Sequence, residues 1–137
     1  MELIEKKHRI EDALEAIRSA QAEGIHEGGG IALVRAAGRV RAPADLSEAQ
    51  RVGFDIVIRS LYAPFKQMCS NCGISSDVIL ERVSKKKGKG YNFRTHKYVD
   101  LFEEGIIDPV KVTCSAVKNS VSVVSTLITT NNAIVEV

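Results

Sequence analysis

The stretch that decides the fold is residues 8–35, HRIEDALEAIRSAQAEGIHEGGGIALVR. Its apolar residues recur with the period of one helix face, at Ile10, Ala13, Leu14 and Ile17. Gly24 stands directly after this pattern, where a glycine commonly ends a helix. The stretch therefore predicts a first helix over about residues 3–23, followed by a turn.

Three consecutive glycines, Gly28, Gly29 and Gly30, then lead into the apolar residues that begin a second helix. The N–H groups at such a helix start carry no blocking side chain and lie at the positive end of the helix dipole. They are therefore suited to hold an anionic or polar ligand. Glycine runs are more often plain loops than ligand cradles, and spacing alone favours the loop.

Helix start and stop signals divide the rest of the chain into short segments. Ser47 is suited to cap a helix, Pro64 to begin one and Gly73 to end it. At Asp108-Pro109 we expect the carboxylate to cap the last helix and the proline to be its first residue. That helix is rich in β-branched residues and is preferred to a strand because a period of two is absent. The predicted helices cover about residues 31–41, 48–62, 64–72, 77–84, 97–104 and 109–129; a basic loop spans 85–90, a short extended piece 91–94 and a terminal strand 133–137.

The predicted segments add up to a mostly α fold, and length and composition indicate one soluble globular domain. A chain of 137 residues is long enough to bury one core, and 45% hydrophobic with 26% charged residues is typical of a globular protein. A formal charge of +2 argues against nucleic acid or an anionic membrane as partner. No apolar run reaches the roughly 18 residues of a membrane span, and the charged N-terminus does not resemble a secretory signal. We expect a cytosolic protein, or one of an organelle matrix.

The cysteines do not indicate a disulfide framework, because their number, three, is odd. Cys69 and Cys72 form a CxxC pair, but no second pair follows at the spacing of a structural zinc site. A redox site of thioredoxin type would need a βαβ context, whereas this pair closes a predicted helix. Buried thiols are the preferred interpretation.

Several separated motifs together resemble one family. They are RIEDAL (9–14), EGI (23–25), GGGIALVR (28–35), RVGFDIVIRSLYAPFKQMCSNCG (51–73), GYNF (90–93), EEGIIDPVKVT (103–113) and ITTNNAIVEV (128–137). In this order they resemble the C-terminal part of a GroEL-type (group I) chaperonin subunit, over nearly everything from Glu5 to Val137. The resemblance implies a chaperonin equatorial-domain-like helical bundle with a long N-terminal helix and a short terminal strand. Residues 1–23 would be an intermediate-domain helix, and residues 24–137 the C-terminal half of the ATP-binding equatorial domain.

The resemblance also assigns a catalytic residue. From the residues alone, Asp12 is an ordinary charge on a helix surface beside Glu11. It occupies the place of the family's catalytic aspartate, and a carboxylate near a γ-phosphate can orient or deprotonate the attacking water. About 18 Å of helix separates Asp12 from Gly24. We therefore expect Gly24 to be a hinge that brings Asp12 to a bound nucleotide only on closure.

Nucleotide-binding residues follow from the same resemblance. Gly28 and Gly29 align with glycines whose backbone contacts the nucleotide, and Asp108 with the aspartate that accepts hydrogen bonds from the ribose. Asn92, Phe93 and Arg94 fall at the adenine loop, where relatives usually have an asparagine and two alanines. Phe93 and Arg94 would either stack on the base or obstruct it. The implied ligand is ATP or ADP.

Other parts of the family's site have no counterpart in this chain. The resemblance places the phosphate-binding loop, the aspartate that binds Mg²⁺ and the substrate-binding apical domain before residue 1, and no Walker motif replaces them. We therefore expect ATP hydrolysis in the full-length assembly and not by this chain alone. The implied partners are identical subunits in a ring, a second ring, a co-chaperonin, and unfolded clients bound through the apical domain.

Two other functions compete with this one. The first is a truncated, non-catalytic helical module that associates with chaperonin rings. The second is a small RNA-binding protein that uses KKKGKGYNFR (85–94), where aromatic side chains beside a basic groove could stack on bases. The near-neutral net charge argues against the RNA-binding protein.

Overall fold

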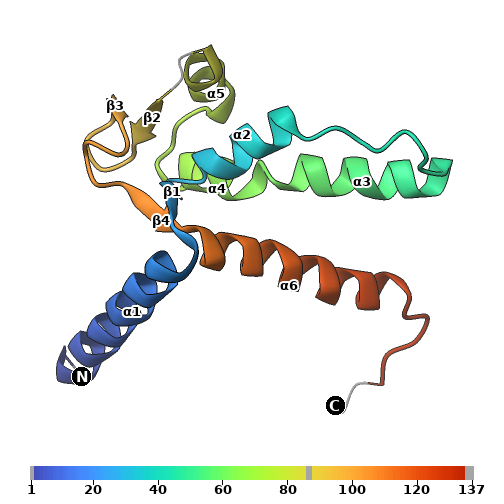
Figure 1. The fold of residues 1–137 in the computed structure, drawn as a ribbon, viewed down its shortest axis with the longest axis horizontal. Helices are drawn as coiled ribbons and strands as arrows, with labels where there is room; N and C mark the ends of the chain where they lie inside the picture. Colours follow the sequence, from blue (N-terminus) through green and yellow to red (C-terminus); the bar gives the residue numbers. More distant parts are fainter. Residues whose placement is uncertain (1, 86–87, 135–137) are drawn as a thin grey trace. The chain divides into compact units, whose positions relative to one another are not determined.

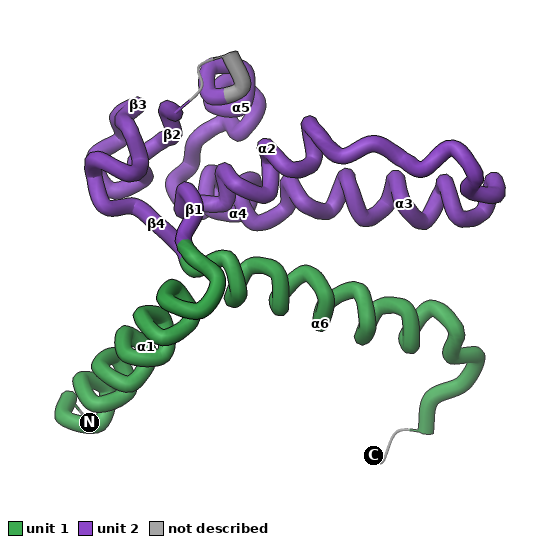
Figure 2. The backbone as a smooth tube through the Cα atoms, viewed as in Figure 1, with its two compact units in different colours: residues 1–24, 109–137 green, residues 25–108 purple. Residues whose placement is uncertain are grey.

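The structure is a computed structural model that describes residues 2–85 and 88–134. It is mostly helical, as the sequence predicts (Figure 1). The chain forms two compact units, residues 1–24 with 109–137 and residues 25–108 (Figure 2). The predicted boundary between an intermediate-domain helix and an equatorial half at residues 23 and 24 remains a prediction.

The first unit contains two helices that contact each other, α1 (Glu2–Glu23) and α6 (Val110–Ile128). The backbone N–H of Val110 donates to the carbonyl of Gly24 over 3.1 Å and joins the ends of the two segments. No described residue of either helix is buried. The predicted apolar stripe of α1 is half exposed at Ile10, Leu14 and Ile17. No helix in residues 2–85 and 88–134 is long and apolar enough to cross a membrane.

The second unit contains four helices and two small sheets. Its elements are β1 (Ile25–Glu27), α2 (Ile31–Arg39), α3 (Glu48–Ser60), α4 (Ala63–Asn71), α5 (Ser76–Lys85), β2 (Lys89–Asn92), β3 (Lys97–Asp100) and β4 (Ile107–Pro109). β1 pairs with β4, and β2 pairs with β3 in antiparallel register, with Gly90 opposite Val99. The core lies between α2, α4, α5 and the β2–β3 hairpin and consists of Ile31, Val34, Phe65, Cys69, Ile79, Val83, Tyr91 and Leu101.

Local signals explain where several helices begin and end. The Ser47 hydroxyl accepts from the N–H of Gln50, and the Gln50 side chain accepts from the N–H of Ser47, which confirms the predicted cap. Pro64 lies in the first turn of α4, where its missing N–H leaves no helical bond unmade. Gly73 follows that helix with φ 68°, a conformation that favours glycine.

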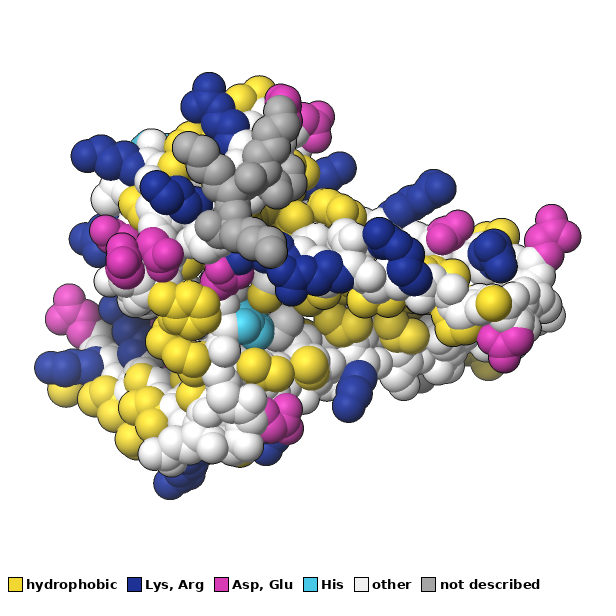
Figure 3. Space-filling model, turned by 45° about the horizontal axis from the view of Figure 1, so that its top comes forward, with side chains coloured by type: hydrophobic (Ala, Val, Ile, Leu, Met, Phe, Trp, Pro, Cys, Tyr) yellow, Lys and Arg dark blue, Asp and Glu magenta, His cyan; other side chains and the backbone are white. Residues whose placement is uncertain are grey.

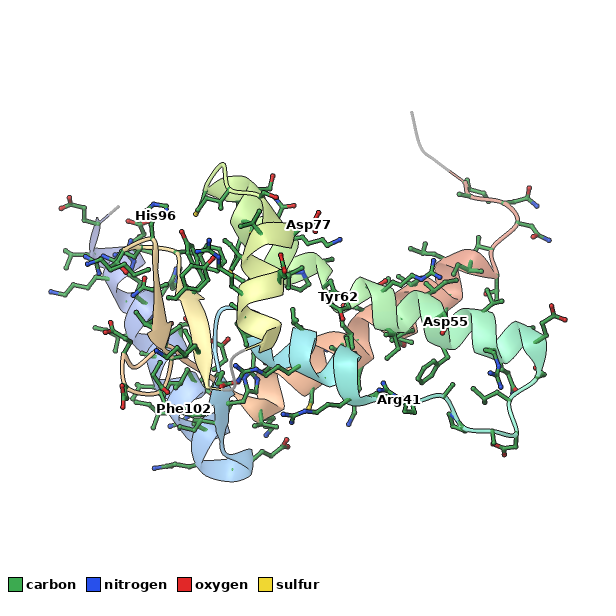
Figure 4. All side chains as sticks on the ribbon, turned by 90° about the horizontal axis from the view of Figure 1, so that it is seen from above. Arg41, Asp55, Tyr62, Asp77, His96 and Phe102 are labelled. Carbon is green, nitrogen blue, oxygen red and sulfur yellow. The ribbon has the colours of Figure 1, made fainter. Side chains whose placement is uncertain are left out.

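The predicted helix over residues 97–104 is wrong. Residues 97–100 form β3, because Tyr98 and Val99 suit a pleated, half-buried strand and pair with β2. The carboxylate of Asp100 then accepts from the N–H groups of Phe102 (3.0 Å) and Glu103 (3.2 Å). This side-chain cap holds residues 101–105 in a turn, visible at Phe102 in Figure 4.

The predicted cap of the last helix is also wrong. Pro109, with φ −69° and ψ 133°, is the residue before α6, and no side chain caps the helix there. Asp108 lies instead in β4, since the residue before a proline is pushed toward extended backbone. The carboxylate of Asp108 therefore has no capping role.

Smaller predictions fail in part. The thiol of Cys69 is buried as expected, whereas Cys72 and Cys114 are exposed. The predicted basic loop over 85–90 is wrong at both ends, because Lys85 ends α5 and Lys89 and Gly90 begin β2. Residues 86 and 87 of this loop lie outside the described residues. Residues 133 and 134 are not in a strand, and the rest of the predicted terminal strand, 135–137, lies outside the described residues.

Candidate functional site

The glycine run forms a tight turn between β1 and α2. Gly29 and Gly30 have φ angles of 64° and 71°, which side-chain-bearing residues rarely adopt. The N–H of Gly28 donates to the carbonyl of Ile106 over 2.9 Å, and the N–H of Ile31 to the carbonyl of Gly28 over 3.4 Å. The turn is thus fixed by its own backbone and leads directly into the first turn of α2, whose N–H groups have few acceptors within the helix.

Two of the three glycines are required by close packing. A Cβ atom on Gly28 would stand 3.1 Å from the carbonyl oxygen of Ile106 and 3.2 Å from the nitrogen of Ile107. A Cβ atom on Gly30 would stand 3.2 Å from the backbone nitrogen of Phe65. Gly29 differs, because the nearest atom to its Cβ position is Cε2 of Phe93, at 4.0 Å. Among the three glycines, Gly29 is therefore the one whose backbone is least crowded by neighbouring atoms and most open to a ligand.

Asn92 shapes the loop that follows β2. Its side-chain oxygen accepts from the N–H groups of Arg94 (2.9 Å) and Thr95 (3.2 Å), and the residue is buried. His96 ends this turn with φ 55° (Figure 4). Asn92 thus has a structural role in holding the loop, and its predicted contact with an adenine base remains a prediction.

Phe93 brings this loop to the glycine turn. Its ring packs edge-on against Phe65, with centroids 5.8 Å apart, and against Tyr91, at 5.2 Å. Both of those neighbours are buried, so they hold the ring next to Gly29. Arg94, by contrast, is exposed. The structure therefore brings together Gly28, Gly29 and Phe93 among the predicted site residues.

The two predicted carboxylates lie in different units. Asp108 is half buried in β4, the strand that pairs with β1, and it follows Ile106, which accepts from Gly28. It therefore lies on the segment that adjoins the glycine turn. Asp12 is exposed on α1 in the first unit. Its predicted role in catalysis remains a prediction.

An ion pair beside the glycine turn was not predicted from the sequence. Arg35 of α2 pairs with Glu27 of β1, and their side chains are only 20% and 13% exposed. Arg35 also donates from Nη2 to the carbonyl of Lys89 over 3.2 Å. Burial lowers the pKa of the Arg35 guanidinium, Arg39 lowers it further by repulsion, and Asp100 opposes both by attraction. A separation of eight residues across a turn follows no helix or strand period, so no sequence pattern predicts this pair.

The aromatic side chains proposed for RNA stacking are used inside the protein. Tyr91 is buried in the core, and Phe93 packs against it. Tyr98 faces the guanidinium of Arg82, 5.5 Å from the ring centroid. Figure 3 shows basic side chains next to acidic ones on the face it presents. Within residues 85–94, Tyr91 is therefore not accessible for stacking on bases, whereas the ring of Phe93 is only half buried.

Comparison with known proteins adds independent findings. The sequence pattern of the TCP-1/cpn60 chaperonin family matches residues 1–137. The fold is similar to a solved structure described as "Crystal structure of group III chaperonin in the open state", with a TM-score of 0.69 and 26% sequence identity. That match covers 85% of this chain and 25% of the other, so this chain spans about a quarter of the length of that relative.

Proposed function

Because the chain belongs to the TCP-1/cpn60 chaperonin family, we propose that it acts within a chaperonin subunit that assists protein folding with ATP. In this proposal it supplies the nucleoside side of the ATP site and the catalytic aspartate, Asp12. The solved relative is a group III chaperonin, so the closer relation to group I that the motifs suggest is part of the proposal. So is the chain's place in a ring of subunits, with a co-chaperonin and unfolded clients as partners.

The observation that carries the proposal is the convergence of Gly28, Gly29 and Phe93, with Asp108 on the adjoining strand. The glycines of the turn carry no side chains of their own that would keep a nucleoside from the backbone. Asp108 does not cap a helix, so both carboxylate oxygens remain suited to the two hydroxyl donors of a ribose. We expect the ligands of Mg²⁺ to come from other parts of the subunit.

The exposed apolar residues of the first unit support action within a larger assembly. α6 carries Val121, Val124, Leu127 and Ile128 at 40–75% exposure, and α1 adds its half-exposed stripe. Apolar faces of this size on two helices with no buried residue are typical of surfaces that other segments cover. In a complete subunit they would pack against the remaining chain.

A binding experiment tests the proposal. We expect Mg·ADP to bind when the remaining chaperonin segments are supplied in trans, with affinity measured by titration calorimetry. Asp108→Asn should weaken binding by about tenfold, because the acceptor-only carboxylate matches two ribose donors better than an amide does. A ring that forms but binds no nucleotide would support the non-catalytic module instead. Failure of Asp108→Asn to change the affinity would contradict the assigned ribose contact.

We also propose that Gly24 is a hinge about which α1 moves after ATP has bound, so that Asp12 reaches the nucleotide for hydrolysis. Gly24 ends the N-terminal segment of the first unit, has φ 85°, and has no atom of the described residues within 4 Å of its Cβ position. Gly24→Val should lower the turnover number of the assembled ring several-fold while the dissociation constant for ATP changes less than twofold. Gly73→Val is the matched control, since Gly73 has φ 68° and equally open surroundings in a turn distant in sequence. Equal loss of binding and turnover, or an equal effect of the control, would contradict the hinge.

A further inference from the structure

Arg35 connects three segments of the second unit. Its guanidinium pairs with Glu27, the last residue before the glycine turn, and donates to the carbonyl of Lys89, the first residue of β2. Arg35 itself lies on α2, which begins directly after the turn. One side chain therefore links the entry of the glycine turn, the helix at its exit, and the strand that leads to Phe93.

The surroundings of Arg35 keep this link in place. The pair is mostly buried, and removing one member of such a pair leaves the other charge without compensation. Arg39, one helical turn further along α2, is exposed and repels Arg35, whereas Asp100 of β3 attracts it. A planar guanidinium can serve a carboxylate and a carbonyl at once, which an ammonium group on a flexible stem does less well.

We propose that Arg35 is a positioning residue for nucleotide binding, which fixes the spacing between the glycine turn and the Phe93 loop. The inference rests on the proposed function, because the spacing matters for binding only if a nucleoside contacts both segments. A Cβ atom on Gly29 would stand 4.0 Å from Cε2 of Phe93, in ordinary van der Waals contact. A small shift of β2 relative to β1 would therefore move the ring against the turn and change the surface that the two present to a nucleoside. Arg35 needs no contact with the ligand for this role.

Four variants of the full chain test the inference, namely Arg35→Ala, Arg35→Lys, Glu27→Gln and Arg39→Ala. Mg·ADP affinity is measured by calorimetry with the remaining chaperonin segments in trans, at a temperature where every variant is folded. Arg35→Ala and Glu27→Gln should weaken binding by about tenfold, because binding would then have to order segments that the ion pair holds in place in the wild type. Arg39→Ala, which removes an exposed charge from the same helix, should change the affinity less than twofold.

Amide hydrogen exchange on the same variants separates positioning from simple stability. Arg35→Ala should speed exchange in residues 28–33 and 89–93 without changing residues 48–60 of α3. Arg35→Lys keeps the charge that faces Glu27 and loses the fork that reaches Lys89, so it should speed exchange only in 89–93. Lower thermal stability of Arg35→Ala with unchanged affinity and unchanged local exchange would overturn the inference. If wild type binds no Mg·ADP, the proposed function fails, and the exchange pattern still decides whether Arg35 positions these segments.

Discussion

Replacing Gly90 by alanine should lower the free energy of unfolding by about 2–3 kcal/mol, although it adds a single methyl group. A Cβ atom on Gly90 would stand 2.3 Å from Cδ1 and 2.5 Å from Cγ of Leu101. Leu101 is fully buried in the core, so a new rotamer of its side chain must displace neighbouring core side chains. Urea denaturation followed by circular dichroism measures the loss.

The expected clash can be separated from any general effect of alanine. Gly53→Ala is the control, because Gly53 lies within α3 with nothing near its Cβ position, and alanine should stabilise that helix by about 0.5–1 kcal/mol. Leu101→Ala alone should cost about 2–5 kcal/mol through the cavity it leaves. In that background Gly90→Ala should cost nothing further, a coupling of about 2–3 kcal/mol in a double-mutant cycle. If the losses in unfolding free energy from Gly90→Ala and Leu101→Ala simply added in the double mutant, the clash with Leu101 would not be the cause of the destabilisation.

The helices could be predicted because their signals are local. The apolar period in residues 10–17 and the cap at Ser47 each act within one or two turns, so they predict α1 and the start of α3. The same holds for the break at Gly73, whose positive φ needs no distant partner. The glycine turn before α2 was likewise readable from three adjacent residues.

Of the strands, only part of β2 was predicted, because the extended piece expected over residues 91–94 overlaps it at residues 91 and 92. The other strands could not be predicted, since their formation depends on distant residues. Residues 97–100 carry helix-compatible charges at both ends and become a strand through pairing with residues 89–92. The pair Asp108-Pro109 is typical of a helix start, so the local sequence predicts a cap. Asp108 instead belongs to a strand whose partner, β1, lies about 80 positions earlier in the sequence. These strands are only three or four residues long, which is too short for an alternating pattern to show in a single sequence.

The residues of the candidate site likewise fall into those that the sequence indicates and those that only the structure reveals. Family resemblance pointed to Asp12, Gly28, Gly29, Asn92, Phe93, Arg94 and Asp108. The structure brings Gly28, Gly29 and Phe93 together, and binding of a nucleotide by any of the seven remains a prediction. The structure gives Asn92 and Phe93 internal packing and hydrogen-bonding roles that the motif alone did not suggest. The Glu27–Arg35 pair could not be foreseen, because its third partner is the backbone of Lys89, 54 residues away from Arg35. Contacts to backbone atoms carry no residue-type signal.

Asp12→Asn should produce the largest functional effect, a loss of about 100-fold to 10,000-fold in ATP turnover by the assembled chaperonin. An amide can neither accept a proton from the attacking water nor carry the charge that orients it. Asp12 is exposed on α1, away from any core, so the substitution should leave folding intact. Steady-state phosphate release measures turnover, and calorimetry should show ATP affinity unchanged within about threefold because a catalytic carboxylate acts mainly in the transition state.

Glu11→Gln is the matched control for the Asp12 prediction. Glu11 is the neighbouring carboxylate on the same helix and forms an exposed ion pair with Lys7 at 3.5 Å. Such a pair contributes little to stability, so its loss should change both folding and turnover by less than twofold. Similar losses from Glu11→Gln and Asp12→Asn would indicate that the charge of the helix matters and not one positioned carboxylate. Undiminished turnover with Asp12→Asn would remove Asp12 from the mechanism, since no general base could be lost without a change in rate.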